Sequence, residues 1–234
     1  MERTFHYEPP KIGDLKSKNP VSTEKYTISV ITPLFGGGVV AGENDKKMLI
    51  RPMSIRGQLR FWWRATRGKT FSSVSEMRKA EQNIWGSTDT PSKVNVTVKI
   101  TKKGNSVAYA DVKPKDIRDN RDNKLPYVLF PFQENRREGK TAKSGTVNIE
   151  FELQCSFPKE LEKDVEAAVW AWVNFGGIGA RTRRGCGALY CEKLAPKNAD
   201  GLKQWFNGAL QQYGIPQQSA AQAREWSTLG HTFY

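Results

Sequence analysis

The chain has 234 residues, of which 38% are hydrophobic and 26% are charged, a composition typical of a globular protein rather than a disordered one. Its 37 lysines and arginines outnumber its 24 acidic residues, so the net charge is +13, which favours an anionic partner such as nucleic acid or an anionic membrane surface. No apolar run is long enough to cross a bilayer, and we find neither a signal-peptide core nor a lysine-rich amphipathic helix. Nucleic acid in a cytoplasmic setting is therefore the favoured partner.

The cysteines and histidines argue against metal and triad chemistry. An odd count of cysteines (Cys155, Cys186 and Cys191) and the lack of a CxxC pair argue against a disulfide framework and a zinc site. We expect reduced thiols in or near the core. The two histidines, His6 and His231, lie near opposite ends of the chain, which argues against a histidine metal site or a Ser/His/Asp triad. No cofactor or metal is expected.

In the N-terminal half, residues 1–25 are rich in proline and lysine and are predicted to form an extended arm. A β-branched, aromatic strand, a glycine-rich loop and two helices should follow. Their expected ranges are Tyr26–Thr32 for the strand, Phe35 to about Ile50 for the loop, Ile55–Arg67 after an N-cap at Ser54 for the first helix, and Ser73–Trp85 for the second, in which Ser73 and Glu76 have capping-box spacing.

In the C-terminal half, alternating residues predict two further strands, and an apolar stripe predicts a core helix. The expected ranges are a strand at Lys93–Thr101, an insertion over 102–144 with a short strand at Leu125–Phe132, a strand at Thr146–Cys155, a helix from Pro158 to Phe175, and a strand at Gly187–Leu194. The segments "GLKQWFNGALQQY" and "AQAREW" look helical.

Without the insertion, the order is strand, helix, strand, strand, helix, strand. This order predicts an α+β fold of the ferredoxin-like, RRM-like βαββαβ type over residues 26–196, with a helical C-terminal extension over 197–234. Helices should cover one face of the antiparallel sheet and leave the other face open. RNA-recognition modules commonly bind RNA on such a face.

The first helix carries a cluster of arginines. Between Lys46 and Ser75 there are eight basic residues and no acidic one. At about 100° per residue, four arginines fall within one narrow arc beside an apolar one: Arg56, Arg60, Arg64 and Arg67. The free N–H groups of the Ser54–Gly57 turn are typical of a phosphate-binding site. The alternative is a solvated arginine face or arginines paired with acids of the insertion, an interpretation that fits Arg64 and Arg67 best.

A glycine–arginine loop follows the last core helix. Gly176–Gly187 contains five glycines and three arginines, Arg181, Arg183 and Arg184. Glycine lets a backbone approach a polyanion closely, and arginine forms bidentate phosphate contacts. The loop joins a helix to a strand and has no Walker-type lysine–serine pair, so a nucleotide cofactor is not predicted. The alternative is a glycine C-cap followed by a mobile basic loop.

Three motifs occur together and in order: "TPLFGGG", "IRPMSIRGQLRFWWRA" and "GGIGARTRRGCGAL". They resemble the RAMP superfamily of CRISPR effector subunits over residues 26–194. Within this superfamily, the tryptophan pair of the second motif and the segment "LPYVLFPF" resemble the branch to which the first subunit of the type III-B Cmr module belongs. The resemblance implies an RRM-derived, non-catalytic subunit that binds CRISPR guide RNA and other RAMP subunits. It would cap the 3′ end of the guide and help to engage target RNA in antiviral defence.

Carried over by motif, the resemblance implies a set of guide-contacting residues: Arg51, Ser54, Arg56, Arg60, Gly177, Gly179, Arg181, Arg183 and Arg184. Members of the family often carry two RAMP domains, whereas this chain has room for one and a helical tail. A second domain from another chain is therefore an open possibility.

Three alternative functions are left open. Backbone RAMP subunits cut target RNA with a divalent metal and an aspartate in the loop after the first strand, and here that loop offers Asp45 and Glu43. The alternative for these two acids is an ordinary polar turn. A guide-processing nuclease would need a histidine as acid–base, and His6 and His231 lie outside the motifs. Sequence-independent RNA binding outside any CRISPR complex is the third.

Overall fold

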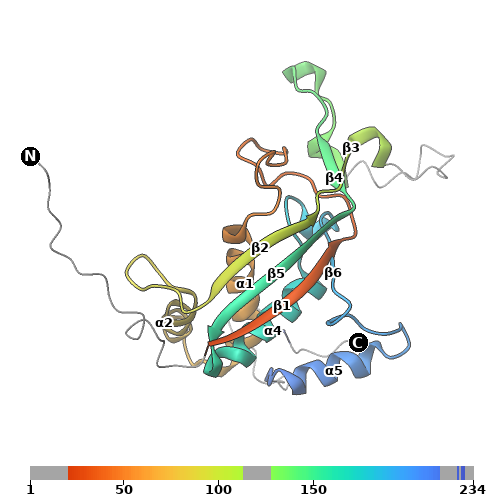
Figure 1. The fold of residues 1–234 in the computed structure, drawn as a ribbon. Coiled ribbons are helices and arrows are strands. Elements are labelled where there is room, and N and C mark those ends of the chain that lie inside the picture. Colours follow the sequence, from red (N-terminus) through yellow and green to blue (C-terminus); the bar gives the residue numbers. More distant parts are fainter. Residues whose placement is uncertain (1–20, 113–127, 217–225, 227, 230–234) are drawn as a thin grey trace, which may run out of the picture.

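The computed structural model describes residues 21–112, 128–216, 226, 228 and 229. It is a mixed helix and sheet structure with two antiparallel sheets (Figure 1). The larger sheet has the strand order β2-β5-β1-β6, and the smaller one pairs β3 with β4. The strands are β1 Val21–Val30, β2 Asn95–Lys102, β3 Asn105–Ala108, β4 Ser144–Val147, β5 Ile149–Pro158 and β6 Leu189–Tyr190.

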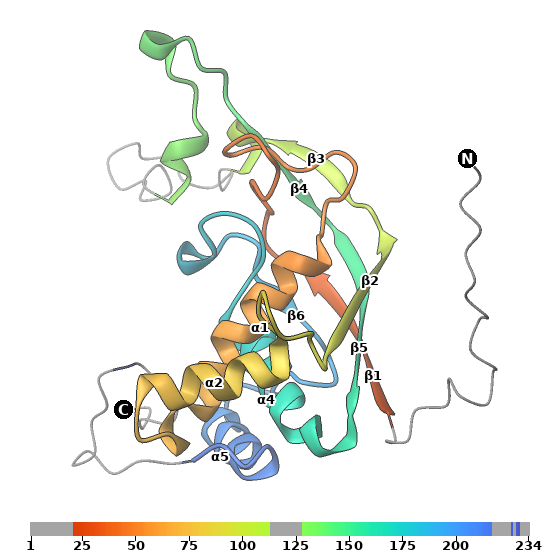
Figure 2. The ribbon, with the colours of Figure 1, turned by 90° about the vertical axis from the view of Figure 1, so that its left-hand side faces the viewer.

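The helices that cover the larger sheet lie on one side of it (Figure 2). They are α1 Pro52–Arg67, α2 Val74–Trp85, α4 Glu162–Phe175 and α5 Leu202–Gln212. Short 3-10 helices connect the elements at Gly68–Thr70, Tyr109–Val112, Phe130–Phe132, Arg136–Glu138, Lys159–Leu161 and Thr182–Arg184.

The core lies between the sheet and the helices α1 and α4. Alternate residues of β1 and β5 face it in register, so that Tyr26 lies opposite Leu153 and Ile28 lies opposite Phe151. This alternation is the period of two that a half-buried strand requires. The helices contribute stripes of large apolar side chains, among them Ile55, Leu59 and Trp63 of α1 and Val165, Trp170 and Trp172 of α4.

The other face of the larger sheet is open and polar. Ion pairs join Lys25 to Glu152 and Lys102 to Glu150, each at 3.7 Å. Among the strand residues of this sheet, Tyr190 of β6, 46% exposed, is the one aromatic side chain on the open face. Since single-stranded RNA is held largely by bases stacked on aromatic rings, this face offers little of what an RRM-like stacking surface needs.

The prediction of a strand at Leu125–Phe132 is wrong for the described part of this segment, which forms helical turns from Val128 to Phe132. Pro131 cannot donate a ladder hydrogen bond. Leu129 and Phe132 are instead buried in a small second core, where the Phe132 ring stacks on Phe35 with centroids 4.5 Å apart. Within the insertion, β3 pairs with β4, which begins at the last residue of the insertion, Ser144.

Several boundaries differ from the expected ones. β1 begins at Val21, before Tyr26, because its first residues pair with the end of β5. The strand expected at Thr146–Cys155 is divided at Asn148, whose φ of 58° separates β4 from β5. α1 begins at Pro52 after Arg51, because proline at the first helical position is pre-set for a helix. β6 is confined to two residues.

Other expectations are confirmed. α2 begins after Ser73, whose hydroxyl oxygen accepts a hydrogen bond from Glu76 N at 3.2 Å, whereas the Glu76 carboxylate accepts from Ser72. α5 coincides with the first C-terminal segment expected to be helical. The three cysteines are free and buried. His6, His231 and most of "AQAREW" lie outside the described residues.

Candidate nucleic-acid interface

Two glycine-rich loops meet at one end of the larger sheet. The first follows β1, and the second is the glycine–arginine loop after α4. Ala180 N donates to Phe35 O at 2.7 Å, and Gly187 N donates to Pro33 O at 3.1 Å. Main-chain hydrogen bonds thus join two segments that are far apart in the sequence into one unit.

Glycine is required where the two loops touch. A Cβ atom built on Gly179 would lie 2.6 Å from Phe35 O, and one on Gly36 would lie 2.8 Å from the Ala180 Cβ. Both residues also have positive φ, of 85° and 68°, which side-chain-bearing residues rarely adopt. Close packing between loops therefore explains these two glycines without any ligand.

A threonine reinforces the contact. The Thr32 hydroxyl donates to Gly185 O at 2.6 Å and accepts from Ala188 N at 2.8 Å. One side chain, just after β1, therefore bonds both a carbonyl oxygen and an N–H group of the returning loop. This role of Thr32 is not predictable from the sequence, since no pattern distinguishes Thr32 from other strand-end threonines.

Arg51 connects α1 to the first loop. It is the N-cap residue of the helix, and its guanidinium donates to Gly37 O. The first turn of α1 contains no acidic residue, and its Ser54 is exposed next to Met53, which is 71% exposed. The positive end of a helix and an arginine thus lie beside the joined glycine loops, an arrangement that suits an anion.

The arginines of the second loop lie on a single turn. Arg181 adopts a left-handed conformation, with φ 58°, and starts the 3-10 turn Thr182–Arg184. Arg183 and Arg184 are exposed, and a hollow at this turn is lined by Arg181, Thr182 and the other two arginines. Arg183 and Arg184 present their charge outward, away from the apolar core, whereas the Nε atom of Arg181 is buried.

The arginines of α1 have protein partners. Arg60 Nε lies 2.6 Å and Arg64 Nη1 lies 2.7 Å from the same oxygen of Glu81, a buried residue of α2. Arg60 also donates to Gly86 O at 3.2 Å, and Arg56 donates to Trp85 O. These arginines attach α1 to α2, although the side chains of Arg60 and Arg64 retain 33% and 38% exposure. Among the described residues, the acidic partner comes from α2.

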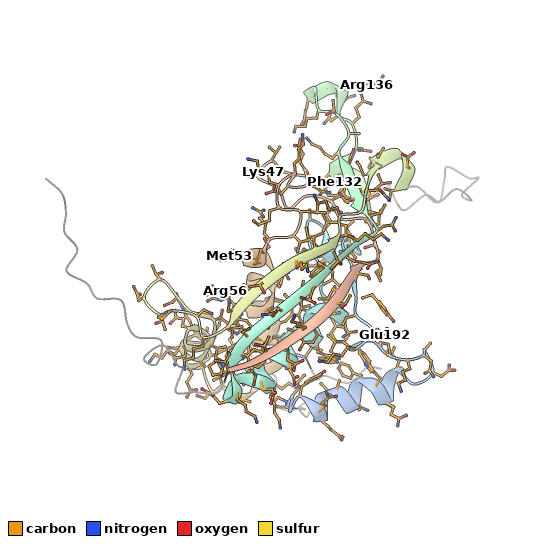
Figure 3. The ribbon with its side chains drawn as sticks, viewed as in Figure 1. Lys47, Met53, Arg56, Phe132, Arg136 and Glu192 are labelled. Carbon is orange, nitrogen blue, oxygen red and sulfur yellow. The ribbon has the colours of Figure 1, made fainter. Side chains whose placement is uncertain are left out.

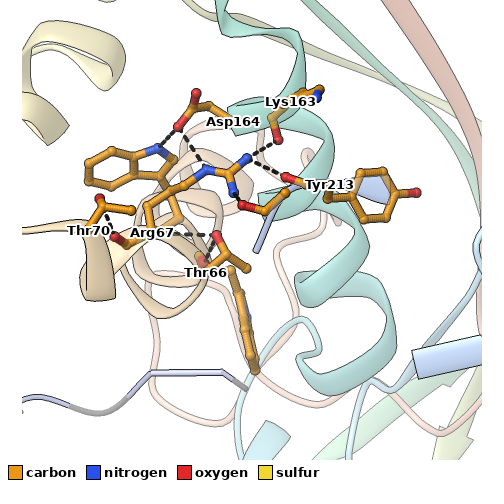
Figure 4. A network of polar contacts seen from close by, with 9 residues as sticks. Thr66, Arg67, Thr70, Lys163, Asp164 and Tyr213 are labelled. Carbon is orange, nitrogen blue, oxygen red and sulfur yellow. Dashed lines mark hydrogen bonds and ion pairs between the residues drawn. The ribbon is translucent and has the colours of Figure 1, made fainter. Parts of the chain in front are cut away.

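Arg67 is structural. Its side chain is buried and forms hydrogen bonds with Asp164, with the carbonyl oxygens of Lys163 and Tyr213, and with Gly214 O (Figure 4). The expectation that Arg67 is among the least available of the α1 arginines is confirmed.

The two acids of the first loop have structural partners. The Asp45 carboxylate accepts from Lys47 N at 2.9 Å and Met48 N at 3.0 Å, and these bonds hold the pKa of Asp45 below its usual value. Glu43 lies 2.7 Å from Lys143 Nζ, and this hydrogen bond lowers the pKa of Glu43. Both carboxylates are charged at neutral pH. Within the described ranges no three His, Cys, Asp or Glu side chains group as they would around a metal ion.

A basic and apolar edge lies beside α1, and the sequence motifs do not predict it. Lys46 and Lys47 are exposed on the first loop together with Val39 and Met48. Figure 3 shows Lys47, Met53 and Arg56 along one side of the molecule, next to α1. The pair Lys46 and Lys47 is visible in the sequence, but it lies between the first motif, "TPLFGGG", and the second, "IRPMSIRGQLRFWWRA".

No helix in the described ranges is both long and apolar enough to span a membrane.

The structure brings Arg51, Ser54, Gly177, Gly179 and the three loop arginines to one end of the fold. Arg56 and Arg60 lie further along α1, turned toward α2.

Comparison with known proteins gives consistent results. The model of the RAMP superfamily matches residues 27–190. Two curated proteins of Pyrococcus furiosus are similar: CRISPR system Cmr subunit Cmr1-2, 29% identical over 72% of this chain and 95% of its own length, and Cmr1-1, 25% identical over 68% of this chain and 46% of its own length. The crystal structure of Cmr1 from the same organism, in the apo form, aligns with a TM-score of 0.61 and 20% identity, over 82% of this chain and 58% of that one. The chain thus spans nearly all of one relative and about half of the others.

Proposed function

The chain belongs to the RAMP superfamily, and from this premise we propose that it is an RNA-binding, non-catalytic subunit of a Cmr-type, type III-B CRISPR ribonucleoprotein. The similarity to two proteins named as Cmr subunits supports the assignment to this branch. The net charge of +13 supports a polyanionic partner.

The fold supports a single ferredoxin-like domain. The strand order β2-β5-β1-β6, with α1 between β1 and β2 and α4 between β5 and β6, is what a βαββαβ unit produces. We infer that residues 26–196 form this domain with an insertion at about 102–144, that 1–25 form an arm, and that 197–234 form a helical extension.

The guide RNA is proposed to lie on the joined glycine loops and the start of α1. The observation that carries this proposal is the main-chain union of the two loops, which sets Arg51 and the turn Arg181–Arg184 at the same end of the sheet. Arginine phosphate contacts and helix N–H groups are the usual means of holding a nucleic-acid backbone. Arg56 and Arg60 would contribute their remaining exposed surface at the margin of this site.

Within the complex, the subunit is proposed to cap the 3′ end of the guide, to contact other RAMP subunits and to help target RNA engage, in the cytoplasm. An endoribonuclease role for Asp45 or Glu43 has no observation in its favour, because each carboxylate is already held by a hydrogen-bond donor of the first loop or the insertion.

A crosslinking experiment tests the proposal. A guide RNA with 4-thiouridine near its 3′ end is assembled with the Cmr subunits and irradiated, and the crosslinked peptides are identified by mass spectrometry. We expect crosslinks in the peptides that contain Arg51 or the turn Arg181–Arg184. Crosslinks confined to other subunits, or to the open sheet face of this chain, would contradict the proposed site.

A further inference from the structure

The described residues of the C-terminal segment lie against α1. Leu229 N donates to Ala65 O at 2.7 Å, and Trp226 Nε1 donates to Gly68 O at 3.1 Å. A Cβ atom on Gly68 would lie 2.8 Å from Trp226 Nε1, so glycine at this position lets the indole approach the end of the helix. Hydrogen bonds thus hold these C-terminal residues as a wall beside α1.

A hollow of about 480 Å³ lies between this wall and the helices α1 and α2, and we call it the α1 hollow. The rings of Phe61, Trp62 and Trp226 line it together with Met77, and Arg64 is the one charged residue of its lining among the described residues. The Phe61 side chain is 52% exposed. Single apolar side chains on a surface are ordinary, but several rings around one hollow offer a place where a flat ring can stack.

Two of these rings favour an aromatic occupant. The rings of Phe61 and Trp62 have centroids 5.3 Å apart, with an angle of 88° between their planes. A flat ring stacked on Phe61 would therefore stand perpendicular to Trp62. Stacked and perpendicular arrangements are both favourable between aromatic rings, and an aliphatic side chain would gain neither.

The α1 hollow has a surplus of positive charge beside it. Arg60 and Arg64 share one oxygen of Glu81, and within the described ranges this is the only carboxylate that pairs with either arginine. One of the two guanidinium charges therefore has no acidic counterpart. The described lining of the hollow contains no acidic side chain either. An occupant that is flat and also carries negative charge, as a nucleotide does, fits both the rings and the charge.

Trp62 connects the α1 hollow to the glycine–arginine loop. Its ring centroid lies 6.2 Å from that of Phe175, an exposed residue at the end of α4. A Cβ atom on Gly176, the first residue of the loop, would lie 2.8 Å from Trp62 Nε1, a buried atom with no hydrogen-bond partner among the described residues. Figure 2 shows the loop on the same side of the sheet as α1. A strand bound at the loop can therefore continue along α1 to the hollow.

We propose that the α1 hollow holds one base of a single-stranded RNA, stacked on the Phe61 ring, with a neighbouring phosphate at the exposed part of Arg64. This inference rests on the proposed function, because the strand is the RNA held by the glycine–arginine loop, and it adds a site for a base to the sites for phosphates. Aromatic rings beside a cationic track are the usual means of holding a single strand. The α1 hollow supplies the stacking surface that the open sheet face largely lacks.

Photocrosslinking in the assembled complex tests the position of the base. The guide RNA carries 4-thiouridine at each of its last ten nucleotides in turn, and the crosslinked tryptic peptides are identified by mass spectrometry. We expect at least one position to crosslink to the peptide Phe61–Arg64, which trypsin releases by cleavage after Arg60 and Arg64. Absence of this crosslink at every position would overturn the base site. If peptides of the glycine–arginine loop still crosslink in that case, the proposed function stands without it.

Substitutions at Phe61 separate stacking from charge. Phe61→Leu removes the ring, Phe61→Tyr keeps it, and Phe130→Leu makes the same change at a ring of the insertion that is 55% exposed. For a labelled adenosine decamer and the full chain, fluorescence anisotropy should show that Phe61→Leu raises the dissociation constant at least about fivefold. The slope of log K against log salt should not change, because stacking releases no counterions. Phe61→Tyr and Phe130→Leu should bind as the unmodified chain does.

Equal affinities of the Phe61→Leu and Phe130→Leu chains would overturn the base site. A shallower salt slope in Phe61→Leu would overturn it as well, since the ring would then act through phosphate contacts. If Phe61→Leu binds RNA normally but no longer assembles with other Cmr subunits, the α1 hollow is a protein-binding surface and the proposal is wrong.

Discussion

Arg67 and Asp164 join the two helices that cover the sheet, with Arg67 Nε of α1 lying 3.1 Å from Asp164 Oδ1 of α4. Trp63 Nε1 donates to the same oxygen at 2.7 Å. The other guanidinium nitrogens of Arg67 donate to the carbonyl oxygens of Lys163, Tyr213 and Gly214. One arginine therefore ties α1 to α4 and to the end of α5.

Replacing Arg67 should destabilise the protein without affecting the RNA site. For Arg67→Ala we expect the free energy of unfolding to fall by about 3–5 kcal/mol, because Asp164 and several carbonyl oxygens lose their donor. Arg183→Ala, at an exposed position, should change it by less than about 0.5 kcal/mol. Urea unfolding measures both. A stable Arg67→Ala protein that no longer binds RNA would contradict the structural role.

Whether the sequence predicts a feature of the structure depends on how far apart in the sequence the interacting residues lie. The β-branched and aromatic residues of β1, the alternation in β2 and β5, and the Ser73 cap are local signals, and they predict strands and a helix start correctly. The partner of Arg60 is Glu81, which lies on a different helix, so the helical arc alone shows the arginines as unpaired. The sequence shows that Gly179 is special, but not that Phe35 O fills the space where its side chain would be.

Removing the arginines of the second loop should weaken RNA binding. For the triple variant Arg181→Ala, Arg183→Ala and Arg184→Ala, we expect a lower affinity for single-stranded RNA. The slope of log K against log salt should become shallower by about 2, because each phosphate contact to a single strand contributes about 0.7. Fluorescence anisotropy at several salt concentrations measures the slope.

A control with the same charge loss distinguishes site from net charge. Arg78→Ala, Lys79→Ala and Lys159→Ala remove three exposed charges from α2 and the turn before α4. These changes should leave the salt slope nearly unaltered. If both triple variants lose affinity equally, the contribution of the loop is only its charge. If the loop variant instead unfolds at a much lower temperature and binds normally, the loop is structural.

A single methyl group at the loop contact should separate the two glycine loops. Gly179→Ala sets a Cβ 2.6 Å from Phe35 O at a φ of 85°, so the contact between Ala180 N and Phe35 O must open. Gly185→Ala has the same backbone requirement, with a φ of 87°, but its Cβ meets no atom within 4 Å. It should cost only the left-handed strain of about 1–2 kcal/mol.

RNA affinity, measured by anisotropy on protein that circular dichroism shows to be folded, separates the two variants. We expect Gly179→Ala to lose affinity, because Arg181 and its turn move away from Arg51. Gly185→Ala should bind as the unmodified chain does. Equal affinity in both variants would mean that the union of the loops does not position the RNA site.

Substitutions at Asp45 separate catalysis from loop structure. Asp45→Asn keeps an oxygen that can accept from Lys47 N and Met48 N, whereas Asp45→Ala removes the acceptor. We expect the assembled complex with Asp45→Asn to cut labelled target RNA at all sites in Mg²⁺, at an unchanged rate. Loss of one cut site in both variants would instead establish a metal-dependent nuclease role for this carboxylate. Loss in Asp45→Ala alone would indicate loop geometry.

The buried thiol of Cys155 should give the protein a characteristic loss of stability at alkaline pH. Burial raises the pKa of Cys155 to about 12 from an ordinary value near 9. The folded state therefore keeps a proton that the unfolded state loses as the pH rises from about 9 to 12, and the free energy of unfolding must fall across this interval. Burial also raises the pKa of Tyr213 to about 12, so part of the decline persists without the thiol.

The variant Cys155→Ala isolates the contribution of the thiol. Its stability should be lower than that of the unmodified chain at pH 7, because a buried side chain is shortened, and its decline from pH 9 to 12 should be shallower. Urea unfolding at half-unit steps of pH gives both slopes. At pH 8, iodoacetamide should modify Cys155 only as fast as the chain unfolds, since the thiol has little thiolate character while folded. Parallel slopes, together with rapid alkylation of the folded chain, would mean that the thiol is not held in the apolar core between β5 and the helices.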